Sequence, residues 1–196
     1  MIEQVSILGL DTGLAHFGYA AISFRVGDPS PSLGITPDGD PVFGVTLTDK
    51  SDKKRQVAST DDNIRRCREL VPPLLRLLQD SCSHLNVRAL AVESMSYPRN
   101  SAVVAQIGLA FGVVATLSEI FNLPIVQLSP KEIKKRLCRN GSASKAEVEK
   151  AVVGLYPGTV GLVAPGVKEH PYDALAVAHA SLDTDIIRMV RQIVRA

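Results

Sequence analysis

The chain begins with a short apolar run that stops at an acidic turn. Residues 5–10 are apolar and β-prone apart from a serine and a glycine, and Asp11-Thr12-Gly13 follows directly. A second β-prone run, residues 18–24, comes after only a few residues, with Gly13 and Gly18 in or near the connection. Two such runs joined so closely predict an antiparallel hairpin. Its buried first strand would therefore deliver a carboxylate at its end.

The rest of the chain alternates strand and helix patterns. Residues 42–47, 87–92 and 124–128 predict three more strands, whereas residues 27–41 are rich in proline and glycine and predict a loop. Helices are expected over residues 60–79, 101–121, 130–138 and 145–154, with a last helix from Pro171 and an amphipathic tail at 186–194. This order predicts an α/β fold in which a mixed five-stranded sheet is flanked by helices, within one domain spanning residues 1–196.

Two of these helices carry more specific expectations. In the first, Pro72-Pro73 would kink or split the helix, and an apolar face is expected. That face would contain Ile64, Leu70, Val71, Leu74, Leu75 and Leu78. The helix over residues 101–121 is apolar nearly all round and is expected to be largely buried. Ser129 and Ser144 are predicted helix N-caps, the second with Glu147 in a capping box.

Composition predicts a cytoplasmic protein that does not act at a membrane. Hydrophobic residues make up 45% and charged residues 21% of the chain, an ordinary globular balance. No apolar run looks long enough and free enough of polar residues to span a bilayer, and the N-terminus does not resemble a secretory signal. The three cysteines, Cys67, Cys82 and Cys138, are odd in number and widely spaced, which predicts reduced thiols rather than a zinc site.

Positive charge is concentrated although the net charge is only +2. Residues 131–150 carry seven basic side chains: Lys131, Lys134, Lys135, Arg136, Arg139, Lys145 and Lys150. A second basic set lies at residues 50–55. Taken alone, such runs indicate a solvated face.

Three acidic residues stand where apolar elements begin or end. Asp11 closes the first strand, Glu93 closes the strand over residues 87–92, and Asp173 lies in the first turn of an alanine-rich helix. Converging carboxylates repel one another, and a divalent cation is the usual remedy; hard oxygen ligands favour Mg²⁺ or Mn²⁺. His170 lies three residues before Asp173, so both can face one side of the helix. The small residues that follow, Ala174 onward, would let this helix lie close to the sheet.

Each of these residues also has a plainer interpretation. Asp11 can form an Asx-turn, and Glu93 can be a solvated strand end. Asp173 can be an acid favoured by the helix dipole, and His170 an ordinary loop histidine. Only the joint arrangement, an apolar strand followed by an acid twice over and a small-residue helix with a third acid, favours a functional site.

Four segments in order resemble the RuvC family of Holliday junction resolvases. They cover residues 7–22, 91–113, 128–153 and 173–178. The second segment contains Tyr97-Pro98-Arg99-Asn100, and the third contains Gly141-Ser142-Ala143-Ser144-Lys145. A lone Asp-x-Gly would be weak support for this family, whereas four segments in the expected order with workable spacing are fairly specific for it.

The resemblance implies a ribonuclease H-like fold and a homodimer that cuts four-way DNA junctions by paired symmetric nicks. The catalytic and metal-binding residues would be Asp11, Glu93, His170 and Asp173, using Mg²⁺ with Mn²⁺ as a substitute. Lys134 and Lys145 fall where the family places lysines near DNA phosphates. The resemblance therefore favours a DNA-binding role for the basic run over a merely solvated face. The other residues expected at the DNA are Tyr97, Arg99, Lys135 and Arg136.

The chain departs from the family at two places. Many members have an aromatic residue three positions after the second acid; here Ser96 stands there and Tyr97 is next. Tyr97 can stack on an opened base or merely pack, and both interpretations stay open. Residues 25–59 are longer than in a typical member, and they either extend the DNA-binding face or form a variable loop. Such departures fit a divergent or phage member.

Other functions remain to be weighed. A related nuclease acting on flaps, forks or other branched DNA would use the same metal site. A non-catalytic DNA-binding protein on a nuclease fold would not need to keep Asp11, Glu93 and Asp173. Actin-like kinases and ATPases also open with strand-Asp-x-Gly-strand, but they need two such domains, for which this chain is too short.

Overall fold

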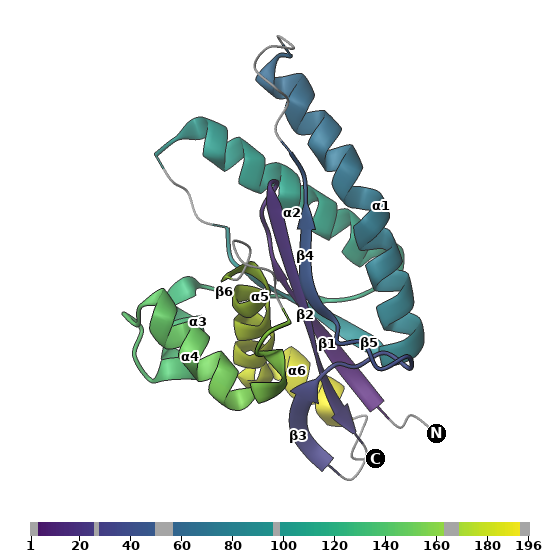
Figure 1. Ribbon diagram of the computed structural model, residues 1–196, viewed down its shortest axis with the longest axis vertical. Coiled ribbons are helices and arrows are strands. Elements are labelled where there is room, and N and C mark those ends of the chain that lie inside the picture. Colours follow the sequence, from purple (N-terminus) through teal and green to yellow (C-terminus); the bar gives the residue numbers. More distant parts are fainter. Residues whose placement is uncertain (1–3, 26–27, 50–56, 96–98, 163–168, 193–196) are drawn as a thin grey trace.

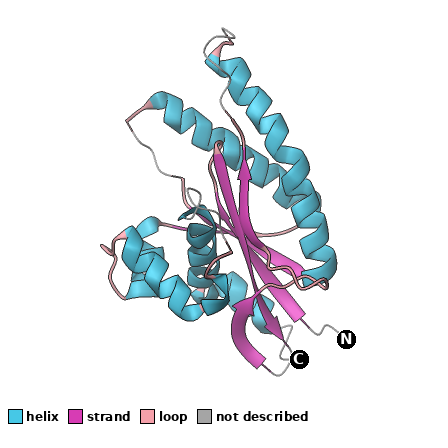
Figure 2. Ribbon diagram, viewed as in Figure 1, coloured by secondary structure: helices cyan, strands magenta, loops and turns pink. Residues whose placement is uncertain are grey.

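One six-stranded sheet forms the centre of the computed structural model, which describes residues 4–25, 28–49, 57–95, 99–162 and 169–192. The strand order is β3-β2-β1-β5-β6, and β4 also pairs with β2. Helices cover both faces of the sheet (Figure 1, Figure 2). The α/β class and the mixed sheet are confirmed, while the expected number of five strands is wrong by one.

The central strands follow the predicted hairpin and its parallel extension. β1 (Gln4–Asp11) and β2 (His16–Arg25) run antiparallel. β5 (Val87–Glu93) lies parallel to β1, and β6 (Ile125–Leu128) lies parallel to β5. The parallel pairing places the ends of β1 and β5 at the same edge of the sheet.

The additional strand is β3 (Asp28–Leu33), within the segment expected to be a loop. It shares the outer edge of β2 with β4 (Phe43–Leu47): β4 pairs along residues 16–20 of β2, and β3 pairs along residues 22–25 with a shift in register. Pro31 argued against a strand because proline lacks an N–H group. An edge strand bonds to one neighbour only, so a proline is tolerated there.

Two helical layers enclose the sheet and explain why β1 is apolar throughout. Val5 and Ile7 point into the core beneath α5, whereas Leu8 and Leu10 point into the core beneath α1 and α2. A strand covered on both faces is apolar at consecutive positions. The helices are α1 (Ser59–Leu85), α2 (Ser101–Phe121), α3 (Pro130–Cys138), α4 (Lys145–Leu155), α5 (Glu169–Ala180) and α6 (Asp185–Gln192), with short 3₁₀ turns η2 (Pro157–Thr159) and η3 (Ser181–Asp183).

Helix α1 is longer than expected, and its buried stripe is narrower. It continues to Leu85, and Pro72 and Pro73 lie inside it without splitting it. Leu70, Leu74 and Leu78, spaced four residues apart, form the buried stripe. Ile64 and Val71, expected on the same face, are 55% and 39% exposed.

Helix α2 corrects two expectations. Only Ala110, Val113, Val114 and Leu117 are buried, because one face alone packs on the sheet and on α1. Among the described helices, α2 is the one that is long and apolar enough to cross a membrane, with 22% of the apolar window buried. The expectation that no apolar run would qualify is therefore wrong.

An apolar groove runs between α1 and α2 and is called the α1–α2 groove below. Its lining comes from both helices: Ile64, Cys67, Val71, Leu75, Gly108, Leu109, Gly112, Val113, Thr116, Leu117 and Ile120. Val113 and Leu117 at its floor are buried, whereas Ile64, Val71 and Ile120 are exposed in the single chain. The exposed face of α2 thus differs from an ordinary solvated helix face.

The two helices of the basic segment begin as predicted. Ser129 and Ser144 each accept a hydrogen bond from the backbone of a glutamate three residues on, and that glutamate bonds back to the serine backbone. The reciprocal bonds satisfy free N–H groups at both helix starts. They also fix where Lys134 and Lys145 leave the backbone.

Candidate active site

Four of the predicted residues meet in one pocket at the edge of the sheet. Asp11 is the last residue of β1, and Glu93 is the last residue of the adjacent parallel strand β5. His170 and Asp173 come from the start of α5, which packs on β1 and β2. The pocket holds about 310 Å³ and is called the carboxylate pocket below. Its lining is Asp11, Glu93, Pro130, Ile133, Lys134, Lys145, Val148, His170, Asp173 and Ala176.

Helix α5 reaches the pocket because it lies directly on the backbone of β1. A side-chain Cβ at Gly9 would lie 2.0 Å from the carbonyl oxygen of Ala174 and 2.8 Å from the Cβ of Ala178. A Cβ at Gly18 of β2 would lie 2.2 Å from the carbonyl oxygen of His170. Glycine in the strands and alanine in the helix are therefore both required. The expected close approach of this helix to the sheet is confirmed.

Asp11 and His170 form a direct hydrogen bond. Nδ1 of His170 lies 2.6 Å from Oδ2 of Asp11, and both side chains are about three-quarters buried. The carboxylate accepts, so Nδ1 carries the proton and Nε2 is the nitrogen left for other partners. The hydrogen bond to Asp11 raises the pKa of His170.

Glu93 and Asp173 have strongly perturbed acidities. Burial, reinforced by the negative charges of Asp11 and Asp173, raises the pKa of Glu93 to about 7. Burial and the charge of Asp11 raise the pKa of Asp173 to about 6. Partly desolvated carboxylates that repel one another favour a bound positive charge. Perturbed acids in a pocket are also typical of active sites.

Lys145 and Lys134 supply positive charge at the same pocket. Nζ of Lys145 lies 2.9 Å from Oε2 of Glu169 and 3.8 Å from Oδ2 of Asp173. Lys134 lines the pocket and, with Lys145, partly offsets the rise in the pKa of Glu93. Both lysines therefore stand where a negatively charged group entering the pocket would meet them.

The possible metal-binding side chains lie in the same pocket but are not arranged to bind one metal ion together. Within the described ranges, no three His, Cys, Asp or Glu side chains are close enough together to hold one metal ion as they are placed. Asp11 instead holds His170, and Asp173 lies beside Lys145. The type of donor still suits a hard cation, since three of the four residues offer carboxylate oxygens.

Because the folded chain raises the pKa of Glu93 and Asp173, we expect stability and Mg²⁺ binding to depend on pH. Between the ordinary glutamate value of 4.5 and about 7, the folded chain binds more protons than the unfolded chain. Without a divalent cation, the free energy of unfolding should therefore fall as the pH rises through this range. Mg²⁺ competes with the proton, so it should raise Tm more at about pH 8 than at about pH 5.5.

Thermal melts of the parent and of Glu93→Gln, with Mg²⁺ and with EDTA, measure this dependence. The glutamine variant removes one of the two titrating groups and should reduce the pH dependence, leaving the part due to Asp173. An equal Mg²⁺-induced rise in Tm at both pH values would contradict the assignment.

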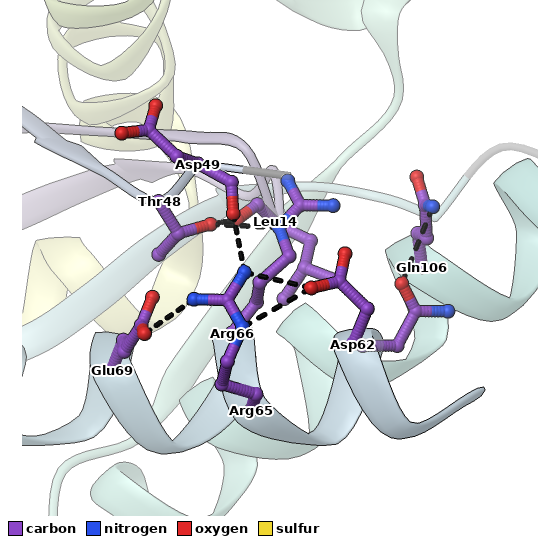
Figure 3. Close-up of polar contacts among 9 residues, drawn as sticks. Leu14, Thr48, Asp49, Asp62, Arg65, Arg66, Glu69 and Gln106 are labelled. Carbon is purple, nitrogen blue, oxygen red and sulfur yellow. Dashed lines mark hydrogen bonds and ion pairs between the residues drawn. The ribbon is translucent and has the colours of Figure 1, made fainter. Parts of the chain in front are cut away.

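The loop that follows Asp11 is tied to α1 by a buried polar contact (Figure 3). Oγ1 of Thr48 donates to the carbonyl oxygen of Leu14 at 2.5 Å and accepts from Nε of Arg66 at 3.0 Å. The backbone N–H of Thr48 donates to the carbonyl of Ala15 at 3.0 Å. Arg66 is 1% exposed, and its Nη2 has no hydrogen-bond partner among the described residues. Nothing in the sequence pattern indicated this hydrogen-bonded contact between Leu14, Thr48 and Arg66.

Among the described residues predicted at the DNA, Arg99, Lys135 and Arg136 do not line the carboxylate pocket. Nη1 of Arg136 donates to the carbonyl of Ala180 at 2.7 Å, at the end of α5. Lys135 is on α3 outside the lining residues, and Arg99 is exposed just before α2. Tyr97 lies outside the described residues.

Two polar residues near the pocket were not anticipated. Glu169 holds Lys145, and His16 stacks on His170, with ring centroids 4.9 Å apart. The register of the hairpin explains the place of His16: Gly18 pairs with Asp11, and residues two apart on a strand share a face. The sequence alone does not give this register, so it could not have identified His16.

The family match and the similar proteins point to the same family. The family "Crossover junction endodeoxyribonuclease RuvC" matches residues 33–180. A protein of that name from Synechococcus sp. (strain WH7803) is 32% identical over 174 residues, covering 88% of this chain and 94% of the relative. One from Granulibacter bethesdensis is 32% identical over 178 residues, covering 89% of this chain and 83% of the relative.

Solved structures agree at the level of the fold. The structure described as "T. thermophilus RuvC in complex with Holliday junction substrate" covers 89% of this chain and 91% of its own, with 23% identity and a TM-score of 0.66. The match to the yeast mitochondrial Holliday junction resolvase Ydc2 covers 96% of this chain and 82% of the yeast chain, with 16% identity and a TM-score of 0.55. The ribonuclease H-like fold is thereby confirmed. The match over residues 33–180, together with these relatives, shows that the chain belongs to the RuvC family of crossover junction endodeoxyribonucleases.

Proposed function

We propose that this protein is a Mg²⁺-dependent endonuclease that resolves four-way DNA junctions by paired symmetric nicks. The observation that carries the proposal is the carboxylate pocket, in which Asp11, Glu93, His170 and Asp173 converge beside two lysines. Membership of the family supports the reaction class and removes the actin-like kinase alternative. A cytoplasmic location, where the protein would meet DNA, stays a prediction.

The types of donor in the carboxylate pocket suit divalent metal ions, although the side chains would have to move closer together to hold one. Asp11, Glu93 and Asp173 would hold them through oxygen, with Asp11 shared and His170 beside Asp173, and this donor set suits Mg²⁺ with Mn²⁺ as a substitute. The raised pKa values of Glu93 and Asp173 support this donor set, because a cation would offset the burial and the mutual repulsion that raise them. When bound, two such ions supply an activated water and charge stabilisation for the leaving 3′-oxygen.

The chain's own side chains would orient and neutralise the substrate. His170 donates through Nδ1 to Asp11, so its Nε2 can accept a hydrogen bond from the attacking water and hold its orientation. Lys134 and Lys145 would neutralise phosphate charges at the mouth of the pocket. The nearby α3 and α4 backbones hold these lysines through their capped first turns.

Paired nicks require two pockets, and the exposed face of α2 supports a homodimer. Ile120 is 61% exposed and Val103 is 40% exposed on this helix, while Val71 of α1 is 39% exposed beside it. Burying such a face against a second copy would remove a large apolar surface from water. A second copy explains the apolar composition better than a membrane does, because the other face of α2, with Val114 and Leu117, is buried in the core that also holds residues of β1 and β5.

Incubation of the protein with four-way, flap and linear DNA, in Mg²⁺ and in EDTA, tests the function. Symmetric nicks confined to the four-way substrate and dependent on Mg²⁺ are the expected result. Faster cutting of flaps or forks would favour the related branched-DNA nuclease, the second candidate. Tight junction binding without cleavage under any divalent cation would favour the non-catalytic DNA-binding protein.

A lysine variant tests the route of the DNA to the pocket. Lys145→Ala should weaken junction binding and reduce the slope of log K against log salt by about one, because one phosphate contact is lost. Lys150→Ala, on the same helix but not in the pocket lining, is the matched control. Binding measured in Ca²⁺ across a salt series separates the two variants, and an unchanged slope for Lys145→Ala would remove this residue from the interface.

A further inference from the structure

The rings of His16 and His170 are stacked in parallel beside Asp11. Their centroids lie 4.9 Å apart and their planes are 5° from parallel. His16 is the first residue of β2 and pairs with Leu47 of β4, whereas His170 comes from the start of α5. Two elements far apart in the sequence thus place one imidazole flat against another.

The hydrogen bond to Asp11 alone does not fix the ring of His170. It holds one atom, Nδ1, and leaves the imidazole free to tilt about that contact. The backbone of His170 is held against Gly18, where a Cβ would lie 2.2 Å from its carbonyl oxygen. The face of His16 supplies the remaining constraint, because a parallel neighbour restricts the plane of the ring.

We infer that His16 is a positioning residue, whose ring holds the plane of His170 so that Nε2 keeps one direction in the carboxylate pocket. The inference rests on the proposed nuclease function, in which His170 orients water. His16 makes no hydrogen bond or ion pair to Asp11, Glu93 or Asp173 among the described contacts, and it does not line the pocket. Its ring therefore acts on the pocket through the ring of His170, while its charge acts separately on Glu169.

Three substitutions at His16 separate stacking from other roles. His16→Ala removes the ring, His16→Gln keeps polar atoms without a ring, and His16→Phe keeps a flat ring without nitrogen. Because His16 is exposed, none of them opens a cavity in the core. His84→Ala, at an exposed histidine in the last turn of α1, is the matched control.

Single-turnover cleavage of a four-way junction in Mg²⁺ gives the rates, and binding in Ca²⁺ gives the affinity. We expect the Ala and Gln variants to cut roughly 10- to 100-fold more slowly at unchanged junction affinity, the scale of a small misplacement of a reacting group. His16→Phe should restore most of the rate. A parent-like rate for Ala or Gln, or a slow Phe variant, would overturn the inference.

Nuclear magnetic resonance of the imidazole groups tests the stack without any cleavage. The carbon-bound ring protons of His170 should lose a ring-current shift in His16→Ala and keep a comparable one in His16→Phe. Unchanged His170 signals in His16→Ala would overturn the stack itself. If the parent cuts no branched DNA while these shifts behave as expected, the nuclease proposal fails and the contact stands.

Discussion

Asp11→Asn is expected to reduce Mg²⁺-dependent cleavage of a four-way junction by about a thousand-fold or more, equivalent to about 4 kcal/mol in the activation barrier. Asparagine has nearly the same shape and can still accept the hydrogen bond from Nδ1 of His170. It lacks the charge that would be shared between two metal ions. Removing that charge should also lower the pKa of Glu93, since the charge of Asp11 contributes to raising it.

The fold and junction binding should survive this substitution. Asp80→Asn, at an exposed position of α1, controls for the loss of one negative charge elsewhere. Circular dichroism, junction binding in Ca²⁺ and single-turnover cleavage distinguish the effects. A folded Asp11→Asn protein that cleaves at the parent rate in Mg²⁺ would remove Asp11 from the metal site.

Ile120→Glu is expected to convert the dimer into monomers and to abolish paired nicking. Ile120 is 61% exposed in the single chain, so glutamate costs little for folding of the monomer. In a dimer built on the α1–α2 groove, the charge would be buried without a partner, which costs several kcal/mol. A cost of about 3 kcal/mol weakens the dimer by roughly two orders of magnitude.

Sedimentation velocity measures the assembly, and a supercoiled plasmid with an extruded cruciform measures the coupling of nicks. Paired nicks give linear plasmid, whereas independent nicks give nicked circles. Met189→Glu, at a 67% exposed apolar residue of the amphipathic helix α6, is the matched control and tests whether α6 forms the dimer contact instead. If Ile120→Glu stays dimeric while Met189→Glu becomes monomeric, the dimer interface lies on α6 and not on α2.

The positions of Asp11 and Glu93 were predictable because the pattern of strands is local. A run of β-prone apolar residues shows where a buried strand ends, and the next residue must then lie at the edge of the sheet. Ser144 with Glu147 was equally readable, since a capping box involves groups only three residues apart. The DNA-side roles of Tyr97 and Arg99 rested on resemblance and stay predictions.

Strand β3 and helix α2 were misjudged for a shared reason. Whether Pro31 is tolerated in a strand depends on whether that strand lies at an edge, and edge position is a property of the assembled sheet. Whether an apolar helix is buried depends on how many neighbours it has. Val103 and Ile120 are as apolar as core residues, but the described part of a single chain leaves them exposed.

By itself, the sequence determined the buried strands, the acids at their ends, the capped basic helices and the small residues that let α5 approach β1. The tertiary structure decided which groups meet: Asp11 with His170, Lys145 with Glu169, and His16 on the ring of His170. The physical reason is that periodicity and capping act between residues a few positions apart. A hydrogen bond or a ring stack between β1, β2 and α5 depends on strand register and on the close fit at Gly9 and Gly18, which exist only in the folded chain.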